Sequence, residues 1–554
     1  MSETPDTTRR EYLLVALIAA AVSALTLLYY YRQDAILLYG DAVAHINIAR
    51  RVFDSQHSGP SQLGTVWLPL PHILMLPFVI SDWAWRTGLG GSIPSMAGYV
   101  AGVLGIFRLL RSGFLRAGAR QGIARAAAWT GAIAYGANPN LLYMQATAMG
   151  ESLYLAFFIW AVVFFADFAR GSDDQQASSK SLCWCAVMLF CCMLTRYDGW
   201  FAAACFGFAA VVVVVKRHWT SSRRPSFRSA ASSGLLGFVL IVATAPAFWL
   251  GWNKFYYGNP MEWMTGPYSA RAIMQRSMQG GAPPHPGYHD VKTAAVYYVK
   301  CAKLNLSGDN LGWGGARYGW PRRIENMWPV LALVSSVLIL VFVRALWPAL
   351  LLSIPLPFYA LSIAYGGVPI FMPVWWPFSF YNVRYGLNML PLAAISLGVA
   401  VGVVCLRARR WWFSFAVAAM AAVFIAVSYG TIWLKSGPVC LHEAAENSAQ
   451  RISLEREAGA YLRSLPASSR FLMQIGYYVG VLERAGIPLK RTINETDFRL
   501  WDAAAADPAA HVDYLVAAGN DRVAEVARQH AASFEAIARF SAQGEPTIVV
   551  YRRK

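Results

Sequence analysis

The chain has 554 residues, of which 56% are hydrophobic and 14% are charged, and its mean hydropathy is +0.38. This composition excludes an ordinary soluble domain and indicates a polytopic membrane protein. The net charge of +18 does not indicate nucleic-acid binding. In a membrane protein, cytoplasmic loops and sites for anionic lipids account for an excess of basic residues.

Apolar runs recur from residue 13 to residue 434, and each can satisfy its backbone polar groups in a bilayer only as a helix. The first run follows Thr8-Arg9-Arg10 and is too long for the hydrophobic region of a signal peptide. It also lacks a small-residue cleavage site, so we interpret it as a retained anchor. We predict eleven transmembrane helices, at residues 13–31, 94–110, 126–146, 152–169, 182–195, 200–215, 232–252, 327–343, 345–365, 386–406 and 412–434.

Basic residues concentrate at alternate ends of these runs, which is the positive-inside pattern and predicts a cytoplasmic N-terminus. An odd number of helices then places the C-terminal segment outside the cytoplasm. Residues 66–84 become a re-entrant or interfacial pair, which Pro69, Pro71 and Pro77 favour because proline breaks a regular helix. The six basic clusters are Arg9 and Arg10; Arg108, Arg111, Arg116, Arg120 and Arg125; Arg170 and Lys180; Lys216, Arg217, Arg223, Arg224 and Arg228; Arg344; and Arg407, Arg409 and Arg410.

Three long segments remain outside the cytoplasm: 32–93, 253–326 and 435–554. Composition changes sharply near residue 435, which predicts a transmembrane domain over 1–434 and a small soluble extracytoplasmic α/β domain over 435–554. In this domain we expect helices at 445–465, 477–485 and 521–531, strands at 470–475 and 512–517, and two apolar hairpin-like pieces at 534–540 and 547–551. The domain shows no nucleotide-binding glycine-rich turn and no catalytic constellation.

Six of the eight cysteines lie inside apolar runs and are interpreted as small core residues. Cys301 and Cys440 lie in the outer segments, and a disulfide between them is an open alternative to free thiols.

Ionisable groups at membrane depth are costly, so they are candidates for function. With the predicted topology, several converge on the extracytoplasmic side: Asp41 ten residues past the first run, Glu151 at the mouth of two runs, Arg196 and Asp198 in one turn, and Arg384 at the start of a run. Each has a structural alternative, namely an Asp that ends a helix, a neighbour of a helix cap, a turn ion pair and an interfacial snorkelling arginine.

The order of these motifs resembles the GT-C glycosyltransferases, and residues 35–400 look like the branch of protein O-mannosyltransferases and lipid A aminoarabinose transferases. Asp41 matches the acid of the first loop, and Glu151 matches the second acidic motif. Residues 195–200 (Thr-Arg-Tyr-Asp-Gly-Trp) and the pair Arg384-Tyr385 resemble two later motifs. Many relatives carry two adjacent acids in the first loop, whereas here Ala42 follows Asp41 and His45 lies four residues on.

This resemblance implies transfer of a sugar from a polyprenyl-phosphate donor to an extracytoplasmic acceptor, in one inverting step with Asp41 as general base. Arginine suits the phosphate because its fork gives bidentate bonds. Glu151 is the second catalytic candidate, as a group that orients the acceptor, pairs with a cationic group of the acceptor or holds an arginine in place. The expected phosphate ligands are Arg384, Arg196, Lys254 and Arg271, and the expected substrate contacts are His45, Asp198, Tyr197, Tyr268 and Tyr385.

The sequence leaves other functions open. A lipid-linked-sugar flippase and an oligosaccharyltransferase with a pyrophosphate-linked donor are the alternatives, and a structural protein with an outer sensor domain leaves Asp41 and Glu151 unexplained. We expect no cofactor, with a divalent metal at Asp41 and His45 as a minor alternative. The expected partners are the donor, a lipid, glycan or protein acceptor and membrane lipids. The expected location is the bacterial inner membrane, and a mannosyltransferase is the expected type.

Overall fold

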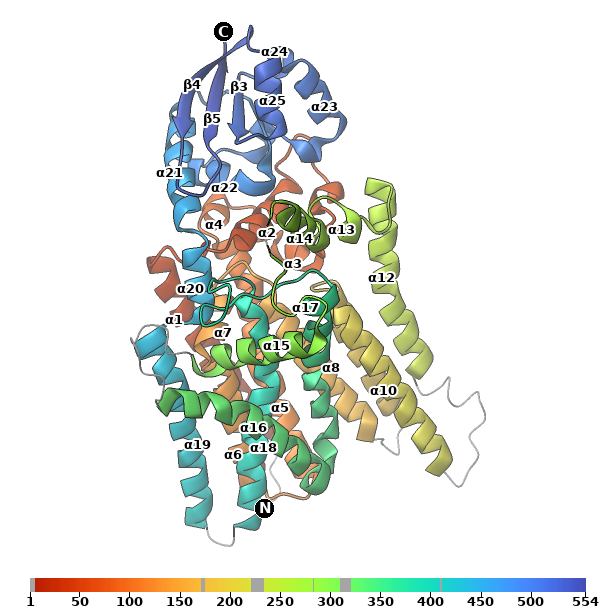
Figure 1. The fold of residues 1–554 in the computed structure, drawn as a ribbon. Coiled ribbons are helices and arrows are strands. Elements are labelled where there is room, and N and C mark those ends of the chain that lie inside the picture. The colour runs from red at the N-terminus through yellow and green to blue at the C-terminus, as the bar shows by residue number, and fades with distance from the viewer. Residues whose placement is uncertain (1–4, 171–174, 221–233, 282, 309–319, 409–410) are drawn as a thin grey trace.

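The computed structural model describes residues 5–170, 175–220, 234–281, 283–308, 320–408 and 411–554. A bundle of long helices carries a small α/β domain at one end, which we call the domain end, and the N-terminus lies at the opposite end (Figure 1). In chain order the bundle contains α1 (Pro5–Arg32), α5 (Leu89–Arg116), α6 (Gln121–Gly136), α7 (Pro139–Gln145), α8 (Glu151–Arg170), α9 (Gln175–Met193), α10 (Asp198–Thr220), α12 (Leu236–Tyr257), α16 (Trp320–Phe342), η3 (Arg344–Ser353), α17 (Pro355–Tyr365), η4 (Val383–Met389), α18 (Leu390–Arg407), α19 (Trp411–Thr431) and η5 (Ile432–Ser436).

Among the described residues, nine helical stretches are long and apolar enough to cross a membrane, and the chain is a multi-pass integral membrane protein. They cover nine of the eleven predicted spans; the other two correspond to α9 and to α6 with α7. Of the predicted basic clusters, Arg223, Arg224, Arg228, Arg409 and Arg410 lie outside the described residues.

The prediction of one continuous helix over 126–146 is wrong. The chain breaks after α6, and Asn138 caps α7 by accepting a hydrogen bond from the backbone N–H of Leu141 (3.0 Å). Pro139 follows as the first residue of α7, where its missing N–H costs nothing because the first turn of a helix has no acceptor for it. This break brings polar residues of α7 to the interior at the domain end.

Short helices cover the domain end of the bundle. The first loop forms α2 (Gly40–Arg51), η1 (Pro60–Leu63), α3 (Leu70–Met75) and α4 (Asp82–Arg86), so residues 66–84 do not form a long helix, as predicted. The later segments form α13 (Glu262–Thr265), α14 (Ala270–Gln279), α15 (Val291–Ser307) and α20 (Val439–Glu446). Of these helices, α2, α4, α13 and α14 lie between the bundle and the α/β domain, whereas α15 lies lower, across the bundle (Figure 1).

Helices α5 and α8 pack closely because glycine faces their contact. A Cβ atom at Gly98 of α5 would lie 2.8 Å from the backbone nitrogen of Leu153 in α8. The absence of a side chain therefore lets the two backbones approach, as small residues do at helix contacts in membranes. The approach fixes the position of the start of α8, where Glu151 lies.

The C-terminal domain contains a five-stranded sheet in the order β2-β1-β3-β5-β4. Strands β1 (Phe471–Met473), β2 (Thr492–Ile493) and β3 (Tyr514–Ala518) are parallel, whereas β4 (Phe534–Phe540) and β5 (Ile548–Arg553) add as an antiparallel pair. Alternate residues face two cores, so Phe471 and Met473 join the main core while Leu472 packs on the other face. The domain's helices are α21 (Ala449–Ser464), α22 (Ile475–Ala485), η6 (Leu489–Arg491), η7 (Glu495–Asp497), α23 (Arg499–Ala506), α24 (Pro508–His511) and α25 (Arg522–Gln529).

The α/β domain rests on the first loop. The side chain of Asn47 in α2 donates to Glu483 in α22 (2.6 Å), and Asp54 accepts hydrogen bonds from the backbone of Leu489 and Lys490 (3.3 Å each). The predicted strands and helices are present, and the sequence missed β2, α23 and α24. The predicted helix 445–465 is divided into α20 and α21.

Candidate active site

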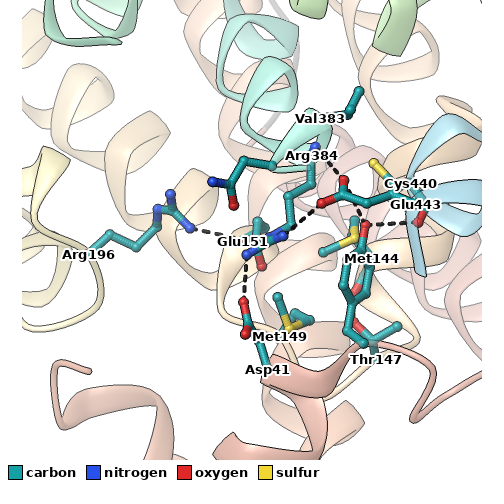
Figure 2. Close-up of polar contacts among 12 residues, drawn as sticks. Asp41, Met144, Thr147, Met149, Glu151, Arg196, Val383, Arg384, Cys440 and Glu443 are labelled. Carbon is teal, nitrogen blue, oxygen red and sulfur yellow. Dashed lines mark hydrogen bonds and ion pairs between the residues drawn. The ribbon is translucent and has the colours of Figure 1, made fainter. Parts of the chain in front are cut away.

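Six ionisable side chains meet at the domain end of the bundle, and we call them the acid–arginine cluster. Its members are Asp41 of α2, Glu151 of α8, Arg196 and Asp198 of the turn before and into α10, Arg384 of η4 and Glu443 of α20. Figure 2 shows Arg384 extending between the three carboxylates of Asp41, Glu151 and Glu443. Residues as far apart in the chain as Asp41 and Glu443 therefore form one site.

Each nitrogen of the Arg384 guanidinium donates to a different carboxylate. Nη2 contacts Asp41 Oδ2 at 2.6 Å, Nε contacts Glu151 Oε1 at 3.2 Å, and Nη1 contacts Glu443 Oε1 at 3.0 Å. The backbone N–H of Arg384 also donates to the second oxygen of Glu443 (3.2 Å). A guanidinium is suited to this role because its donors are fixed in one plane.

The backbone around Arg384 is shaped by its neighbours. Asn382 adopts a left-handed conformation (φ 56°), which asparagine tolerates better than most residues, and its side chain donates to the carbonyl of Pro369 (2.9 Å). Gly386 lies against α15, where a Cβ atom would be 2.5 Å from the carbonyl oxygen of Cys301. The short helix η4 therefore begins at a fixed position and places Arg384 inside the cluster.

Arg196 forms the second half of the cluster. It donates to Glu151 Oε1 (3.1 Å), to Asp198 Oδ2 (3.4 Å) and to the hydroxyl of Tyr359 (2.9 Å). The ring of Tyr385 lies next to both guanidiniums, 4.8 Å from Arg196 and 5.1 Å from Arg384. Glu151 thus bridges the two arginines through one oxygen, which fits the expectation that it holds an arginine in place.

Asp198 is held by polar side chains from two other helices. Tyr359 of α17 donates to its Oδ2 atom (2.9 Å), and Asn388 of η4 donates to the same atom (3.3 Å). Asn388 also donates to the Tyr359 hydroxyl (2.8 Å). This network fixes the turn that carries Arg196.

The cluster has more carboxylates than guanidiniums, and only one of its carboxylates is accessible. The side chain of Asp41 is 39% exposed, whereas those of Glu151, Asp198 and Glu443 are at most 3% exposed. Within the described part of the chain, Glu151 Oε2 and Asp198 Oδ1 are buried oxygens that accept no hydrogen bond. Such oxygens are rare in folded proteins and mark a place where a proton, water or ligand binds.

A buried pair of histidines lies beside the cluster. His45 follows Asp41 by one turn of α2, and its Nδ1 atom is 2.7 Å from His72 Nε2 of α3. Burial is the main cause that lowers the pKa of both rings, and for His72 the neighbouring His45 lowers it further. The pair is therefore neutral at pH 7 and shares one hydrogen between the two facing nitrogens.

The His45–His72 contact bears on the metal alternative. In the described ranges, no three His, Cys, Asp or Glu side chains are grouped as a metal site would require. His72 is not among the site residues predicted from the sequence. The structure instead places it in contact with a predicted substrate residue.

Four predicted site residues lie away from the carboxylates that contact Arg384. Lys254 donates to the carbonyl of Gly258 at the end of α12 (2.9 Å), and Arg271 is exposed on α14. Tyr197 stacks on Trp263 (4.4 Å between ring centres) and donates to the carbonyl of Val66 (2.9 Å), which ties its turn to the first loop. The last, Tyr268, accepts from Gln474 of the α/β domain (3.3 Å).

Glu443 is the main cluster residue that the sequence analysis missed. It lies nine residues past the last predicted transmembrane helix, in the segment assigned to the soluble domain. Helix α20, which carries it, nevertheless packs on α7, α15 and η4 of the bundle. Its carboxylate also accepts from the hydroxyl of Tyr39 (3.2 Å). The available signal was an acid inside an apolar stretch, Val439–Glu446, directly after the last membrane helix.

Tyr359 and Asn388 were also missed, because uncharged polar residues in apolar runs carry little signal. Cys301 and Cys440 are free thiols, so the disulfide alternative is wrong. The Cys301 thiol donates to the carbonyl of Val383 (3.0 Å), and the Cys440 thiol donates to Asn305 Oδ1 (3.3 Å). Both help to position η4 and α20 around Arg384.

An apolar groove of about 620 Å³ runs down the side of the bundle between α3, α5, α8 and α9. Its lining begins with Leu74 and Leu153, two residues from His72 and Glu151, and extends to Phe164 and Trp184. Every residue that lines it is apolar or glycine. A groove of this kind can hold a hydrocarbon chain whose polar end lies near the cluster.

These features define the class of fold as a polytopic membrane protein with a charged cluster under a small α/β domain. No protein-family model matches the chain, and no curated protein matches it. Solved structures do match over almost the whole chain. Crystal structures of ArnT from Cupriavidus metallidurans align with it at 13% identity, with TM-score 0.54 when bound to undecaprenyl phosphate and 0.55 in the apo state.

The ArnT alignments cover 99% and 98% of this chain and 98% of ArnT in each case. An oligosaccharyltransferase from Archaeoglobus fulgidus, in complex with zinc and sulfate, aligns with TM-score 0.45 at 12% identity over 91% of this chain and 68% of that one. The likeness to ArnT shows that the chain has the GT-C fold that the sequence predicted.

Proposed function

We propose that the protein is a membrane glycosyltransferase that moves one sugar from a polyprenyl-phosphate donor to an acceptor at the domain end of the bundle. The observation that carries this proposal is the arrangement around Arg384, whose guanidinium is shared by three carboxylates of which Asp41 alone is accessible. An arginine with one replaceable partner is suited to receive a phosphate.

In the proposed binding step, the donor phosphate replaces Asp41 at Arg384 Nη2. Nε and Nη1 keep their contacts with the buried Glu151 and Glu443, so the guanidinium stays in place. Arg196, which shares Glu151 with Arg384, adds a second positive charge at a short distance. The same step releases the carboxylate of Asp41 next to the sugar, so donor binding and activation of the base are linked.

In the proposed transfer step, Asp41 takes the proton from the acceptor's nucleophilic atom as that atom attacks the anomeric carbon. The new glycosidic bond forms while the bond from that carbon to the phosphate oxygen breaks, and the electron pair leaves with polyprenyl phosphate. The configuration at the anomeric carbon is inverted. Arg384 and Arg196 stabilise the charge that grows on the leaving phosphate, so they lower the barrier as well as bind the donor.

The apolar groove is the proposed site for the prenyl chain. It runs along α8 from Leu153, two residues after Glu151, to Phe164, and a chain laid in it contacts apolar side chains and glycine only. ArnT, which shares the fold, has been crystallised with undecaprenyl phosphate, and this supports a carrier of the same class. Because the chain comes from lipid tails that are as apolar as the groove, the groove would orient the chain by packing, and the polar contacts of the phosphate would supply most of the specific affinity.

The orientation in the membrane is part of the proposal. Of the described basic residues in the predicted cytoplasmic clusters, Arg108, Arg116 and Arg170 meet at Asp167 near the end of α8 opposite Glu151. A cytoplasmic location of this end places the cluster and the α/β domain outside the cytoplasm. We propose the bacterial inner membrane as the location and a hexosyl or pentosyl group, mannose in the first instance, as the cargo.

A donor panel tests the function. Purified full-length protein in lipid nanodiscs is incubated with polyprenyl-monophosphate and polyprenyl-pyrophosphate sugars, with water as the substitute acceptor, and the released carrier is identified by mass spectrometry. We expect release of polyprenyl monophosphate from a monophosphate donor. Release of a pyrophosphate carrier indicates an oligosaccharyltransferase instead, and movement of the intact donor across vesicles without bond cleavage indicates a flippase.

A further inference from the structure

A second cavity, of about 580 Å³, lies where the first loop meets the α/β domain. It is separate from the acid–arginine cluster and shares no lining residue with it. Four arginines line it: Arg86 of α4, Arg456 and Arg463 of α21, and Arg484 of α22. We call this cavity the arginine pocket.

The arginine pocket keeps most of its positive charge. Within the described residues, no carboxylate lies within ion-pair distance of Arg86 or Arg463, and Arg463 donates instead to the backbone carbonyls of Ala485 (3.0 Å) and Arg484. Arg456 pairs with Asp34 (2.7 Å), but both side chains are more than 60% exposed, so the pair is weak. Arg484 donates to the buried Glu455 (3.2 Å).

The one acid that lines the arginine pocket is Glu483. Its carboxylate is buried and accepts from Asn47 (2.6 Å), and burial raises its pKa to about 8. Glu483 is therefore mostly protonated at pH 7 and does not neutralise the arginines. Arg86 and Arg463 face each other's charge without an acid partner in the described residues, so an anion in the cavity would stabilise the contact between loop and domain.

The surroundings of the arginine pocket have the composition of a membrane–water interface. Asp34, which pairs with Arg456, follows the last residue of the membrane helix α1 by two positions. Trp83, which lines the cavity, is 61% exposed, and the nearby Ile80 is 65% exposed. Exposed tryptophan and apolar residues beside arginines are typical of the membrane–water interface.

We propose that the arginine pocket binds the anionic phosphate group of a lipid headgroup. Arginines from the loop and from the domain would contact the same phosphate, since the guanidinium fork matches its oxygens. The bound lipid would thereby join the α/β domain to the first loop and to the bilayer. The proposal is independent of the transfer reaction, in which none of these residues takes part.

Native mass spectrometry of the full-length, delipidated protein in detergent tests the proposal. Phosphatidylglycerol is the anionic probe, and phosphatidylcholine is the probe with the same phosphate but no net charge. The test variant is Arg86→Gln with Arg456→Gln, and the matched control is Arg522→Gln with Arg552→Gln, two exposed and paired arginines of the same domain that lie outside the pocket. We expect phosphatidylglycerol to bind at least about tenfold more weakly to the test variant, and unchanged to the control.

A second pair of variants removes no arginine. Ala460 lies on the exposed side of α21 and lines the pocket. Ala460→Glu places a carboxylate among the guanidiniums and should abolish phosphatidylglycerol binding, whereas Ala460→Gln, of similar size, should retain it. Inorganic phosphate that displaces the lipid at millimolar concentration would identify a free phosphate as the ligand of the same site. Equal binding of both lipids, or unchanged binding in both test variants, would overturn the proposal.

Discussion

Substitution of Asp41 by Asn separates the two roles that the proposed function gives to this residue. The variant keeps the size of the side chain and removes its charge, so it cannot take the acceptor's proton and competes with the donor phosphate for Arg384 Nη2 only through a neutral amide oxygen. Turnover should fall by roughly 10²–10⁴-fold, the range that a general base contributes. Donor affinity should not fall with it.

The expected change in affinity follows from the geometry of the ion pair. Asp41 and Arg384 are 2.6 Å apart, but the side chain of Asp41 is 39% exposed, so solvent screens the pair and it is worth at most about 1 kcal/mol. Loss of this competitor should therefore tighten donor binding by up to roughly fivefold. This combination of slower turnover and equal or tighter binding is specific to a base that the phosphate displaces.

The assay measures kcat from the rate of carrier release and Kd from calorimetric titration with polyprenyl phosphate. Asp34→Asn is the matched control, because Asp34 lies in the same loop, is also accessible and is also paired with an arginine (Arg456, 2.7 Å). The control should match the wild type in kcat. Wild-type turnover in Asp41→Asn, or a clear loss of polyprenyl phosphate binding, would refute the reasoning.

Four further substitutions test the surroundings. Arg384→Lys should reduce turnover at least about tenfold, because one ammonium nitrogen cannot contact the three carboxylates that the three guanidinium nitrogens contact. Arg384→Ala should reduce turnover further. Its free energy of unfolding should also fall by about 3–5 kcal/mol, since the buried Glu151 and Glu443 lose this partner. Glu443→Gln should lower the free energy of unfolding by roughly 1.5–3 kcal/mol and slow turnover, and an unchanged unfolding temperature in detergent would exclude a role for its charge. The pKa of Glu483 is raised to about 8 in the folded state, above its ordinary 4.5, so the folded state binds the proton more tightly than the unfolded state. The free energy of unfolding of the wild type should therefore fall, on the order of a few kcal/mol, as pH rises from about 4.5 to 8. Glu483→Gln should remove this dependence, which melting curves at pH 6 and pH 9 would measure.

The sequence predicted much of the cluster because charge is costly in apolar surroundings. Asp41, Glu151, Arg196, Asp198 and Arg384 each interrupt or border an apolar run, and the structure brings all five together. The contacts of Arg384 with Asp41 and Glu151 were not predictable, because these residues are 343 and 233 positions apart and their pairing depends on the rotation and height of each helix. The sequence therefore treated Arg384 as a free phosphate ligand, whereas the structure places it among three acids.

The residues that were missed share a different physical reason. Glu443 lies beyond the last predicted membrane helix. The change in composition near residue 435 placed the predicted domain boundary before it, although α20 packs on the bundle. Tyr359 and Asn388 are uncharged, so nothing in an apolar run distinguishes them from core residues. His72 has no helical spacing from His45 in the sequence. Only the packing of α3 on α2 brings His45 Nδ1 and His72 Nε2 to 2.7 Å.

The central claim is that the carrier's phosphate binds Arg384 in place of Asp41. Electron cryo-microscopy of the full-length protein in nanodiscs with a polyprenyl phosphate tests it most directly. We expect the phosphate within hydrogen-bond distance of Arg384 Nη2, the carboxylate of Asp41 turned away from the guanidinium, and the prenyl chain in the groove lined by Leu153 and Phe164. A phosphate bound elsewhere, with the pair of Asp41 and Arg384 intact, would contradict the claim.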